Sequence, residues 1–338
     1  MSIVFFGEIM QRLTPAQPQQ KLVNTKNYAV DFAGAESNVA SSLGRLGHQV
    51  TFVTKLPHNP IGDHCLATLK QYGIDTTFCQ RGGERIGSYF IELGASIRPS
   101  RVVYDRKYSA FSAIQTGEFN WQTILQGKSW LFLGGITPAL SENCAKELVI
   151  AAKTANQMGV KVAFDVNFRR SLWTEAQQKA GVPEHYFSQI LHYSDLAFAN
   201  AGSVADVFAQ TFHEKHPIEQ AKRIASYLNN RFNLCAAITC REHNSASSNQ
   251  LAAVYLEKGE YYLTNWLEVE ILDRLGTGDA FAAGLLHGLL NDWSCQHSIE
   301  FANAAFALAH TCYGDQHWSD EQEINTVAQG QISGHVIR

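Results

Sequence analysis

Short apolar runs that alternate with longer helical stretches limit the folds open to this chain more than any other feature of its sequence. The strand-like runs cover residues 3–6, 50–54, 130–133, 161–165, 195–199 and 234–239. The helical stretches cover residues 36–46, 61–72, 142–158, 184–192, 218–229, 299–312 and 320–329. Runs this short and apolar suit strands that are buried on both faces. The alternation therefore predicts an α/β fold, in which a mostly parallel central sheet carries helices on both faces.

Two segments interrupt this alternation. Residues 10–33 are polar, and residues 85–112 contain two runs, 87–93 and 102–107, in which apolar and polar side chains alternate. A period of two is typical of half-exposed antiparallel strands. We expect these segments to form a protruding β lid of two or three strands. The expected division is a lid of residues 10–33 and 85–112 on an α/β domain of residues 1–9, 34–84 and 113–338.

Composition excludes several classes of function. The net charge of −4 gives no electrostatic reason to expect nucleic acid or an anionic membrane as a partner. No apolar run is long enough to span a membrane, and the N-terminus resembles a first strand rather than a signal peptide. The seven cysteines lack Cys-x-x-Cys spacing, which predicts free thiols and a cytoplasmic location. Because the histidines are scattered, we assign no residue as a metal ligand.

The stretch with the clearest chemistry is residues 273–281. An alternating run over 269–272 predicts a strand leading into it, and an apolar run over 279–290 predicts a helix leaving it. Glycines let backbone N–H groups crowd around an anion, and a helix N-terminus adds unpaired donors and partial positive charge. Gly276, Thr277 and Gly278 could therefore hold a phosphate that gathers charge during transfer.

Asp279 follows this turn on the first turn of the predicted helix, where it could take a proton from an attacking hydroxyl. The alternative is a tight strand–helix turn with an ordinary N-terminal carboxylate. A dinucleotide fingerprint would need glycine where Phe281 stands, and no nicotinamide fingerprint follows the first strand, so a dehydrogenase is disfavoured. A P-loop ending at Gly127-Lys128-Ser129 would need glycine where Gln122 stands.

Further polar residues lie at helix entries, in the lid and after predicted strands. Gly34 permits close approach of a ligand, and Glu36 and Asn38 could bind hydroxyls, although a helix entry with a solvated face is an alternative. In the lid, the candidates are Tyr89, Tyr104 and Arg106; a surface cross-strand cluster is their alternative. Residues at the carboxyl ends of parallel strands are placed where α/β proteins bind ligands. They are the run 165–173, Asn200, Thr239 and Arg241.

Together these residues resemble the PfkB, or ribokinase-like, family of carbohydrate kinases over nearly the whole chain. Residues 273–281 resemble the family's C-terminal signature, and residues 34–47 resemble its N-terminal one. Within the family, residues 34–38, 104–106 and 165–173 are most similar to 2-keto-3-deoxygluconate kinases. Fructokinases share the Asp-x-Asn-x-Arg…Leu-Trp pattern of the last run but usually have proline in the place of Glu36.

The resemblance implies a ribokinase-like fold and an ATP- and Mg²⁺-dependent kinase that phosphorylates 2-keto-3-deoxygluconate to its 6-phosphate. Asp279 would be the general base, beside an anion hole formed by Gly276, Thr277 and Gly278. With the hydroxyl-binding candidates included, the substrate-binding set is Gly34, Glu36, Asn38, Tyr89, Tyr104, Arg106 and Arg169, with Arg169 on the carboxylate. The ATP-binding set is Asn200, Thr239, Gly276, Gly278 and Asn303. Asp273 would help to bind a monovalent cation.

One position departs from the family pattern, and it keeps other interpretations open. The family usually has Asn-x-x-Glu where this chain has Asn200 and Ser203, and that glutamate organises the waters of Mg²⁺. A catalytically silent sugar-acid-binding protein is therefore one alternative, and a fructokinase or other neutral-sugar kinase is another. The expected partners are a small sugar acid and ATP. A homodimer through the free face of the lid is a further hypothesis.

Overall fold

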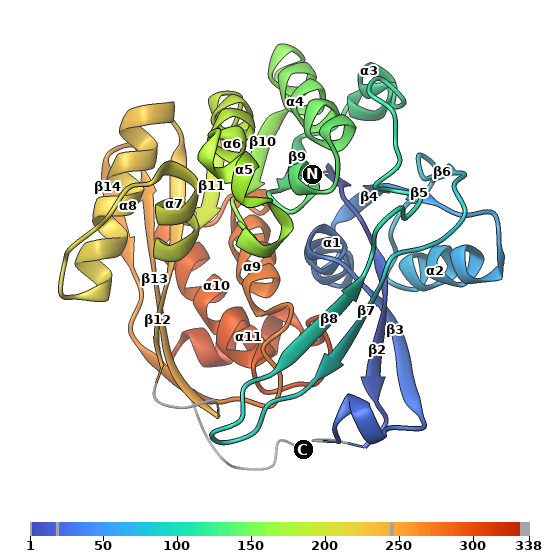
Figure 1. The fold of residues 1–338 in the computed structure, drawn as a ribbon. Helices are drawn as coiled ribbons and strands as arrows, with labels where there is room; N and C mark the ends of the chain where they lie inside the picture. The colour runs from blue at the N-terminus through green and yellow to red at the C-terminus, as the bar shows by residue number, and fades with distance from the viewer. Residues whose placement is uncertain (1, 18–19, 244–246, 332–338) are drawn as a thin grey trace.

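The structure, a computed structural model, describes residues 2–17, 20–243 and 247–331. Its larger sheet has nine strands (Figure 1), and six neighbouring strands in it are parallel. In spatial order these are β4 (Gln49–Val53), β1 (Ser2–Phe6), β9 (Trp130–Gly134), β10 (Lys161–Asp165), β11 (Leu196–Ala199) and β12 (Cys235–His243). Three antiparallel strands complete the sheet: β13 (Ser248–Glu257), β14 (Glu260–Leu263) and β15 (Leu267–Glu270). The predicted mostly parallel sheet is confirmed.

Helices cover both faces of this sheet because the side chains of each strand alternate between two separate cores. In β1, Val4 and Phe6 belong to one core, and Ile3 and Phe5 belong to the other. The first core receives α4 (Glu142–Gln157), α6 (Val182–His192), α7 (Ala201–Phe208) and α8 (Pro217–Phe232). The second receives α1 (Ala35–Arg45), α2 (Pro60–Gln71), α9 (Thr277–Leu290) and α10 (Cys295–Ala309). The remaining helices are α3 (Trp121–Leu125), α5 (Glu175–Lys179) and α11 (Glu321–Ala328).

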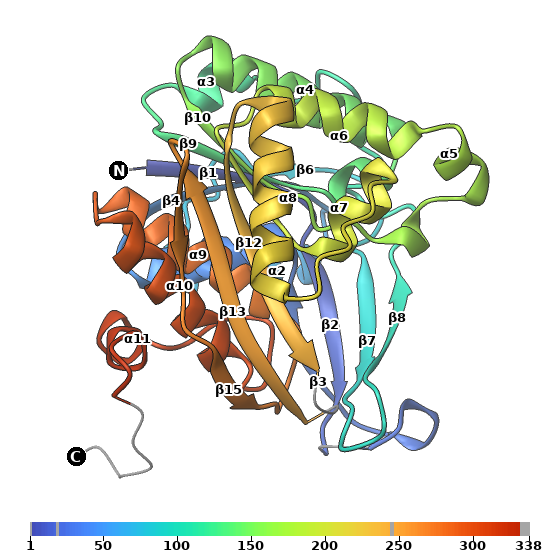
Figure 2. The same cartoon turned by 90° about the vertical axis from the view of Figure 1, so that its left-hand side faces the viewer.

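A second sheet extends away from the first and has four strands rather than the two or three expected (Figures 1 and 2). Its order is β3 (Tyr28–Ala33), β2 (Met10–Pro15), β7 (Ser88–Glu92) and β8 (Arg101–Asp105). The polar composition of residues 10–33 conceals β2 and β3, which are held by long-range pairing: β2 lies parallel to β7 and antiparallel to β3. A two-stranded ribbon, β5 (Lys55–Leu56) with β6 (Gln80–Arg81), lies apart from both sheets.

The register of the second sheet separates its two faces. One row across the four strands is Val30, Leu13, Phe90 and Val103, and the neighbouring row is Asp31, Arg12, Tyr89 and Tyr104. Neighbouring rows project from opposite faces. The row with Tyr89 and Tyr104 borders the cavity described below, and the apolar row therefore faces away from it.

Candidate active site

The glycine turn at the start of α9 is built for close approach of an anion. Gly276 adopts a left-handed conformation with φ of 71°, and a Cβ atom there would lie 1.9 Å from the backbone oxygen of Asp315. A side chain at Gly278, by contrast, would meet no atom within 4 Å, because this residue borders the open cavity. Thr277 Oγ1 donates to the backbone oxygen of Arg274 at 3.1 Å and fixes the turn. The first N–H groups of α9 are thus available to a phosphate. The strand leading to the turn, β15, ends at Glu270, two residues earlier than expected.

Asp279 lies on the first turn of α9 and is only 8% exposed, yet it borders the cavity. Burial raises the pKa of its carboxyl group well above the ordinary value, while a hydrogen bond from Asn38 lowers it in part. That bond joins Asn38 Nδ2 to Asp279 Oδ2 at 2.7 Å. Asn38, expected as a substrate ligand, therefore has a clear second role, because it orients the carboxylate and stabilises its charged form.

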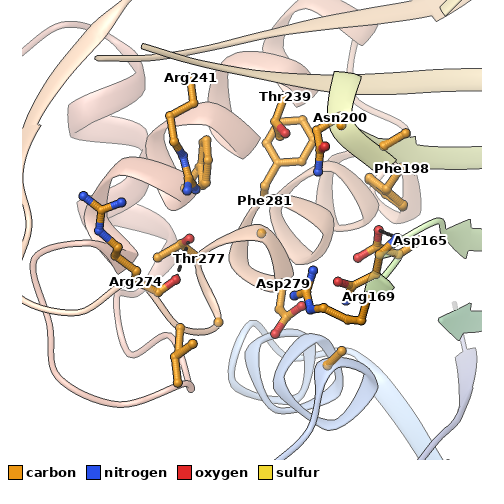
Figure 3. Close-up of a pocket in the computed structure, with 18 of the residues that line it drawn as sticks. Asp165, Arg169, Phe198, Asn200, Thr239, Arg241, Arg274, Thr277, Asp279 and Phe281 are labelled. Atoms are coloured by element: carbon orange, nitrogen blue, oxygen red, sulfur yellow. Dashed lines mark hydrogen bonds between the residues drawn. The ribbon is translucent and has the colours of Figure 1, made fainter. Parts of the chain in front are cut away.

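A cavity of about 590 Å³ runs from this carboxylate in two directions (Figure 3). Towards the second sheet it is lined by six residues expected to bind the substrate: Gly34, Asn38, Tyr89, Tyr104, Arg106 and Arg169. The rings of Tyr89 and Tyr104 lie 6.0 Å apart across β7 and β8. Gly34 is required at the start of α1, because a Cβ atom there would lie 2.1 Å from the backbone oxygen of Glu8.

The two arginines on this side differ in their surroundings. Arg106 is buried and forms an ion pair with Glu8, its Nε lying 2.9 Å from Glu8 Oε2. Arg169 is exposed to the cavity, where it lies close enough to the carboxyl groups of Asp165 and Asp279 to lower the pKa of both against the effect of burial (Figure 3). The charge of Arg106 is thus neutralised within the protein, whereas Arg169 faces the space that a ligand would fill.

The structure places one predicted substrate residue, Glu36, outside the lining of the cavity. Its side chain is buried and fills the space beside Gly7 and Gly134, where any Cβ atom would lie 2.3 Å from the Glu36 carboxyl group. Burial raises the pKa of Glu36 to about 7, and Thr137 Oγ1 donates to it at 3.3 Å. Glu36 therefore packs the first turn of α1 against Gly7 and Gly134 and does not face the cavity.

The other side of the cavity is lined by Asn200, Thr239, Gly276 and Gly278, all expected to bind ATP (Figure 3). Asn303, expected with them, does not line the cavity. It is buried in α10, where its Nδ2 donates to the backbone oxygen of Asn265 at 3.2 Å. Arg241 and Arg274 also line this side and add positive charge that suits a polyphosphate.

Ser203 has a local role in the structure. Asn200 caps α7, its side chain accepting a hydrogen bond from Ser203 N at 2.9 Å, while Ser203 Oγ lies 3.1 Å from Asn200 N. This reciprocal pair is a capping box, in which glutamate is also common at the third position. The serine preserves the helix start but contributes no carboxylate to the cavity.

The sequence placed Asp165 in a candidate run without giving it a role, and it missed two other residues of the site. Asp165 ends β10 and lines the cavity, and burial raises its pKa to about 6. Arg12 and Asp315 belong to a buried network beside the glycine turn. Nothing local marks either of them, because they are 303 positions apart in the chain.

The cavity fits a nucleotide and its metal. Its walls combine the donors of the glycine turn with an apolar side that includes Ala221, Ile224 and Phe306. Within the described residues there is no group of three or more histidine, cysteine or acidic side chains that could hold a metal alone. Mg²⁺ needs no such group, since it usually takes one or two carboxylates together with substrate phosphates and water. Three carboxylates line the cavity, and since Asp315 is paired with Arg12, Asp165 and Asp279 are the two that could meet the ion.

A buried carboxylate, a glycine turn at a helix N-terminus and a two-sided cavity at the carboxyl ends of parallel strands define an enzyme that transfers a phosphoryl group to a hydroxyl. The pfkB family carbohydrate kinase model matches residues 1–322. The chain therefore belongs to the pfkB family of carbohydrate kinases, which are phosphotransferases.

Individual relatives agree with this assignment. The crystal structure of 2-dehydro-3-deoxygluconokinase from Thermotoga maritima matches with a TM-score of 0.91 at 39% identity, over 98% of this chain and 100% of that one. The 2-dehydro-3-deoxygalactonokinase of Haloferax volcanii is 28% identical over 98% of both chains. A protein from E. coli provisionally named ribokinase II, solved with ATP and Mg²⁺, has a TM-score of 0.82 at 19% identity over 97% of this chain and 99% of that one, which shows the ribokinase-like fold alone. In the described part of the chain, no helix is long and apolar enough to cross a membrane.

Proposed function

We propose that the enzyme uses ATP and Mg²⁺ to phosphorylate 2-keto-3-deoxygluconate on its terminal hydroxyl, giving the 6-phosphate. The observation that carries this proposal is the place of Arg169, whose guanidinium faces the same cavity as Asp279 and the glycine turn. A guanidinium binds a carboxylate with two parallel hydrogen bonds, which suits a sugar acid better than a neutral sugar. The relatives named above, a deoxygluconokinase and a deoxygalactonokinase, are named for acids of this class.

The positions of these groups support a direct in-line transfer. The terminal hydroxyl oxygen attacks the γ-phosphorus of ATP, its proton passes to Asp279, and the bond to the β-phosphate oxygen breaks to release ADP. The N–H groups around Gly276 and Gly278 stabilise the charge that gathers on the transferred group. Bound Mg²⁺ would neutralise charge on the phosphates. The proton taken up by Asp279 then leaves to solvent as the product departs.

The proposal is tested by measuring ADP release with ATP and Mg²⁺ against 2-keto-3-deoxygluconate, gluconate, fructose, ribose and adenosine. We expect a strong preference for the keto-deoxy acid over fructose, ribose and adenosine, because these three have no carboxylate for Arg169. Gluconate has the same carboxylate and terminal hydroxyl, so its turnover measures what the 2-keto and 3-deoxy groups add. Turnover on fructose alone would support the kinase mechanism but contradict a pocket that binds the carboxylate of a sugar acid. If no sugar reacts, isothermal titration with the sugar acid distinguishes a silent binding protein from an enzyme with another substrate.

We further propose that residues 10–33 and 85–112 form a lid and that two lids pair in a homodimer. The outward row of the lid sheet is apolar, and two of its members, Val30 and Val103, are 47% and 43% exposed. An exposed apolar row next to open strand edges is typical of an interface. Sedimentation of the purified protein should give a dimer, and Val103→Lys should shift it towards monomer. A wild-type protein that is monomeric at every concentration would contradict this pairing.

A cytoplasmic location is also proposed. All seven cysteines are free thiols, and Cys65, Cys144 and Cys240 among them are buried. Free thiols of this kind persist in a reducing compartment. Labelling of the protein in fractionated cells would test the location.

A further inference from the structure

Arg12 connects the lid to two buried carboxylates beside the glycine turn. Its Nη2 atom lies 2.6 Å from Asp273 Oδ2, and its Nη1 atom forms an ion pair with Asp315 Oδ1. The side chains of Arg12 and Asp273 are 5% and 1% exposed, and that of Asp315 is 10% exposed. Within the described residues, no other basic side chain pairs with either carboxylate. One guanidinium thus pairs with two acidic groups that water scarcely reaches.

The surroundings of Asp273 do not fit the monovalent cation that was expected there. Its Oδ1 atom accepts hydrogen bonds from the backbone N–H groups of Arg274 and Leu275, at 2.7 and 3.1 Å. Its Oδ2 atom accepts from Arg12 and from the N–H group of Gly314, at 2.6 and 3.2 Å. A carboxylate offers about four lone-pair sites. Four donors fill them, so no site on the Asp273 carboxylate is left for an ion.

The two carboxylates hold the segments that shape the glycine turn. Asp273 binds the N–H groups of the residues immediately before Gly276. The backbone of Asp315 packs against Gly276 so closely that its oxygen occupies the space of a Cβ atom. Asp315 is held in addition by Tyr89, whose hydroxyl donates to its Oδ2 at 2.8 Å. Any movement of these two side chains would therefore move the backbone donors that face the phosphate.

We propose that Arg12 is the built-in cation of the phosphate-binding turn, standing in the place of a bound monovalent ion, and that turnover is independent of K⁺ and Na⁺. Arg12 is a positioning residue, since it does not line the cavity but fixes Asp273 and Asp315. A cation attached to the chain needs no ion from solution, and a buried pair is little screened by salt. This role rests on the kinase activity of the family but not on the identity of the sugar.

The first test uses the wild-type enzyme. ADP release is measured with whichever sugar the enzyme accepts, at constant ionic strength, in tetramethylammonium chloride and then with K⁺ or Na⁺ in its place. We expect the same turnover in all three salts. Activation by K⁺ of about tenfold or more, the size of a typical coupling between two sites, would overturn the proposal.

The second test removes the built-in cation with Arg12→Gln. Displacing catalytic donors by about 1 Å costs up to about 10²-fold in rate, so we expect a loss of about tenfold to 10²-fold in kcat in tetramethylammonium chloride. Guanidinium or K⁺ at moderate concentration should restore part of this loss. K⁺ should also raise the Tm of Arg12→Gln more than that of the wild type, a readout that needs no substrate. A variant with wild-type kcat in every salt would overturn the proposal.

Two further variants separate positioning from general stability. Arg81→Gln removes a surface ion pair, with Asp63 at 2.7 Å, outside the cavity lining, and should show no response to K⁺ or guanidinium beyond that of the wild type. Arg12→Lys keeps a positive charge and should remain independent of added cations even if its kcat falls. If Arg12→Gln does not fold, the wild-type and Arg12→Lys measurements still decide, because activation of both by K⁺ would contradict a built-in cation.

Discussion

Asp279→Asn is expected to lower kcat by about 10²–10⁴-fold, the usual effect of removing a general base. The amide has nearly the shape of the carboxylate, and its oxygen can still accept the hydrogen bond that Asn38 donates at 2.7 Å in the native enzyme. The sugar and ATP should therefore bind as before, so that KM changes little while kcat falls. Steady-state kinetics with the accepted sugar measures both constants.

The same substitution should stabilise the fold, which separates a catalytic role from a structural one. Burial raises the pKa of Asp279 in the folded protein above its unfolded value of 3.8. The folded state therefore favours the protonated form of Asp279. The stability that this preference contributes is present below the unfolded pKa and is lost as the pH rises through the folded pKa. The neutral amide of the Asp279→Asn variant does not have to ionise in a buried position. The variant should therefore have a higher Tm than the wild type at neutral pH, and the difference in Tm should vanish below about pH 4.

The pH dependence of activity provides a further check on Asp279. The acid side of the wild-type kcat/KM profile should fall off at higher pH than an exposed aspartate would give, because the base must be ionised and burial raises its pKa. Asp63→Asn, which removes a surface partner of Arg81, is the matched control and should leave the profile unchanged. Full turnover by Asp279→Asn would exclude Asp279 as the base.

Arg169→Ala is expected to weaken the enzyme towards the sugar acid far more than towards a neutral sugar. A charge-assisted hydrogen bond contributes about 1.5–3 kcal/mol, which corresponds to a loss of roughly 10- to 10²-fold in kcat/KM for the acid. This energy applies when the substrate fills the cavity and excludes water. In the empty cavity Arg169 is exposed to solvent. For fructose, which has no carboxylate, only packing is lost, and the decrease should be several-fold smaller.

The neighbouring arginine offers a matched control. Arg170 has the same charge, but it lies outside the cavity lining and pairs with Asp206 on the surface, where its side chain is 65% exposed. Arg170→Ala should therefore leave the ratio of the two substrates unchanged. Arg169→Lys keeps the charge but not the two parallel donors, and it should fall between the wild type and Arg169→Ala. If Arg169→Ala lowers kcat/KM equally for the acid and the neutral sugar, Arg169 does not bind the substrate carboxylate.

The alternation of apolar runs with helical stretches was sufficient to predict the architecture. Each of the six parallel strands and each of the predicted helices is present, because burial on both faces leaves a signal in every strand and amphipathic spacing leaves one in every helix. The glycine turn and Asp279 could be found in the same way, since they are adjacent in the chain and their chemistry depends on local backbone conformation. The sequence therefore identified features that lie close to the end of a strand, such as the glycine turn and Asp279.

The contacts that complete the site were decided only by the tertiary structure. Asn38 reaches Asp279 across 241 positions, and Arg12 reaches Asp273 and Asp315 across 261 and 303 positions. Glu36 and Asn303 were predicted to bind ligands, yet both are buried and neither lines the cavity. A local pattern fixes the backbone of its own segment, but the partner of a polar side chain depends on which distant segment the fold brings beside it. For the same reason the sequence could not show that Asp273, predicted to help bind a monovalent cation, pairs with Arg12 of the second sheet.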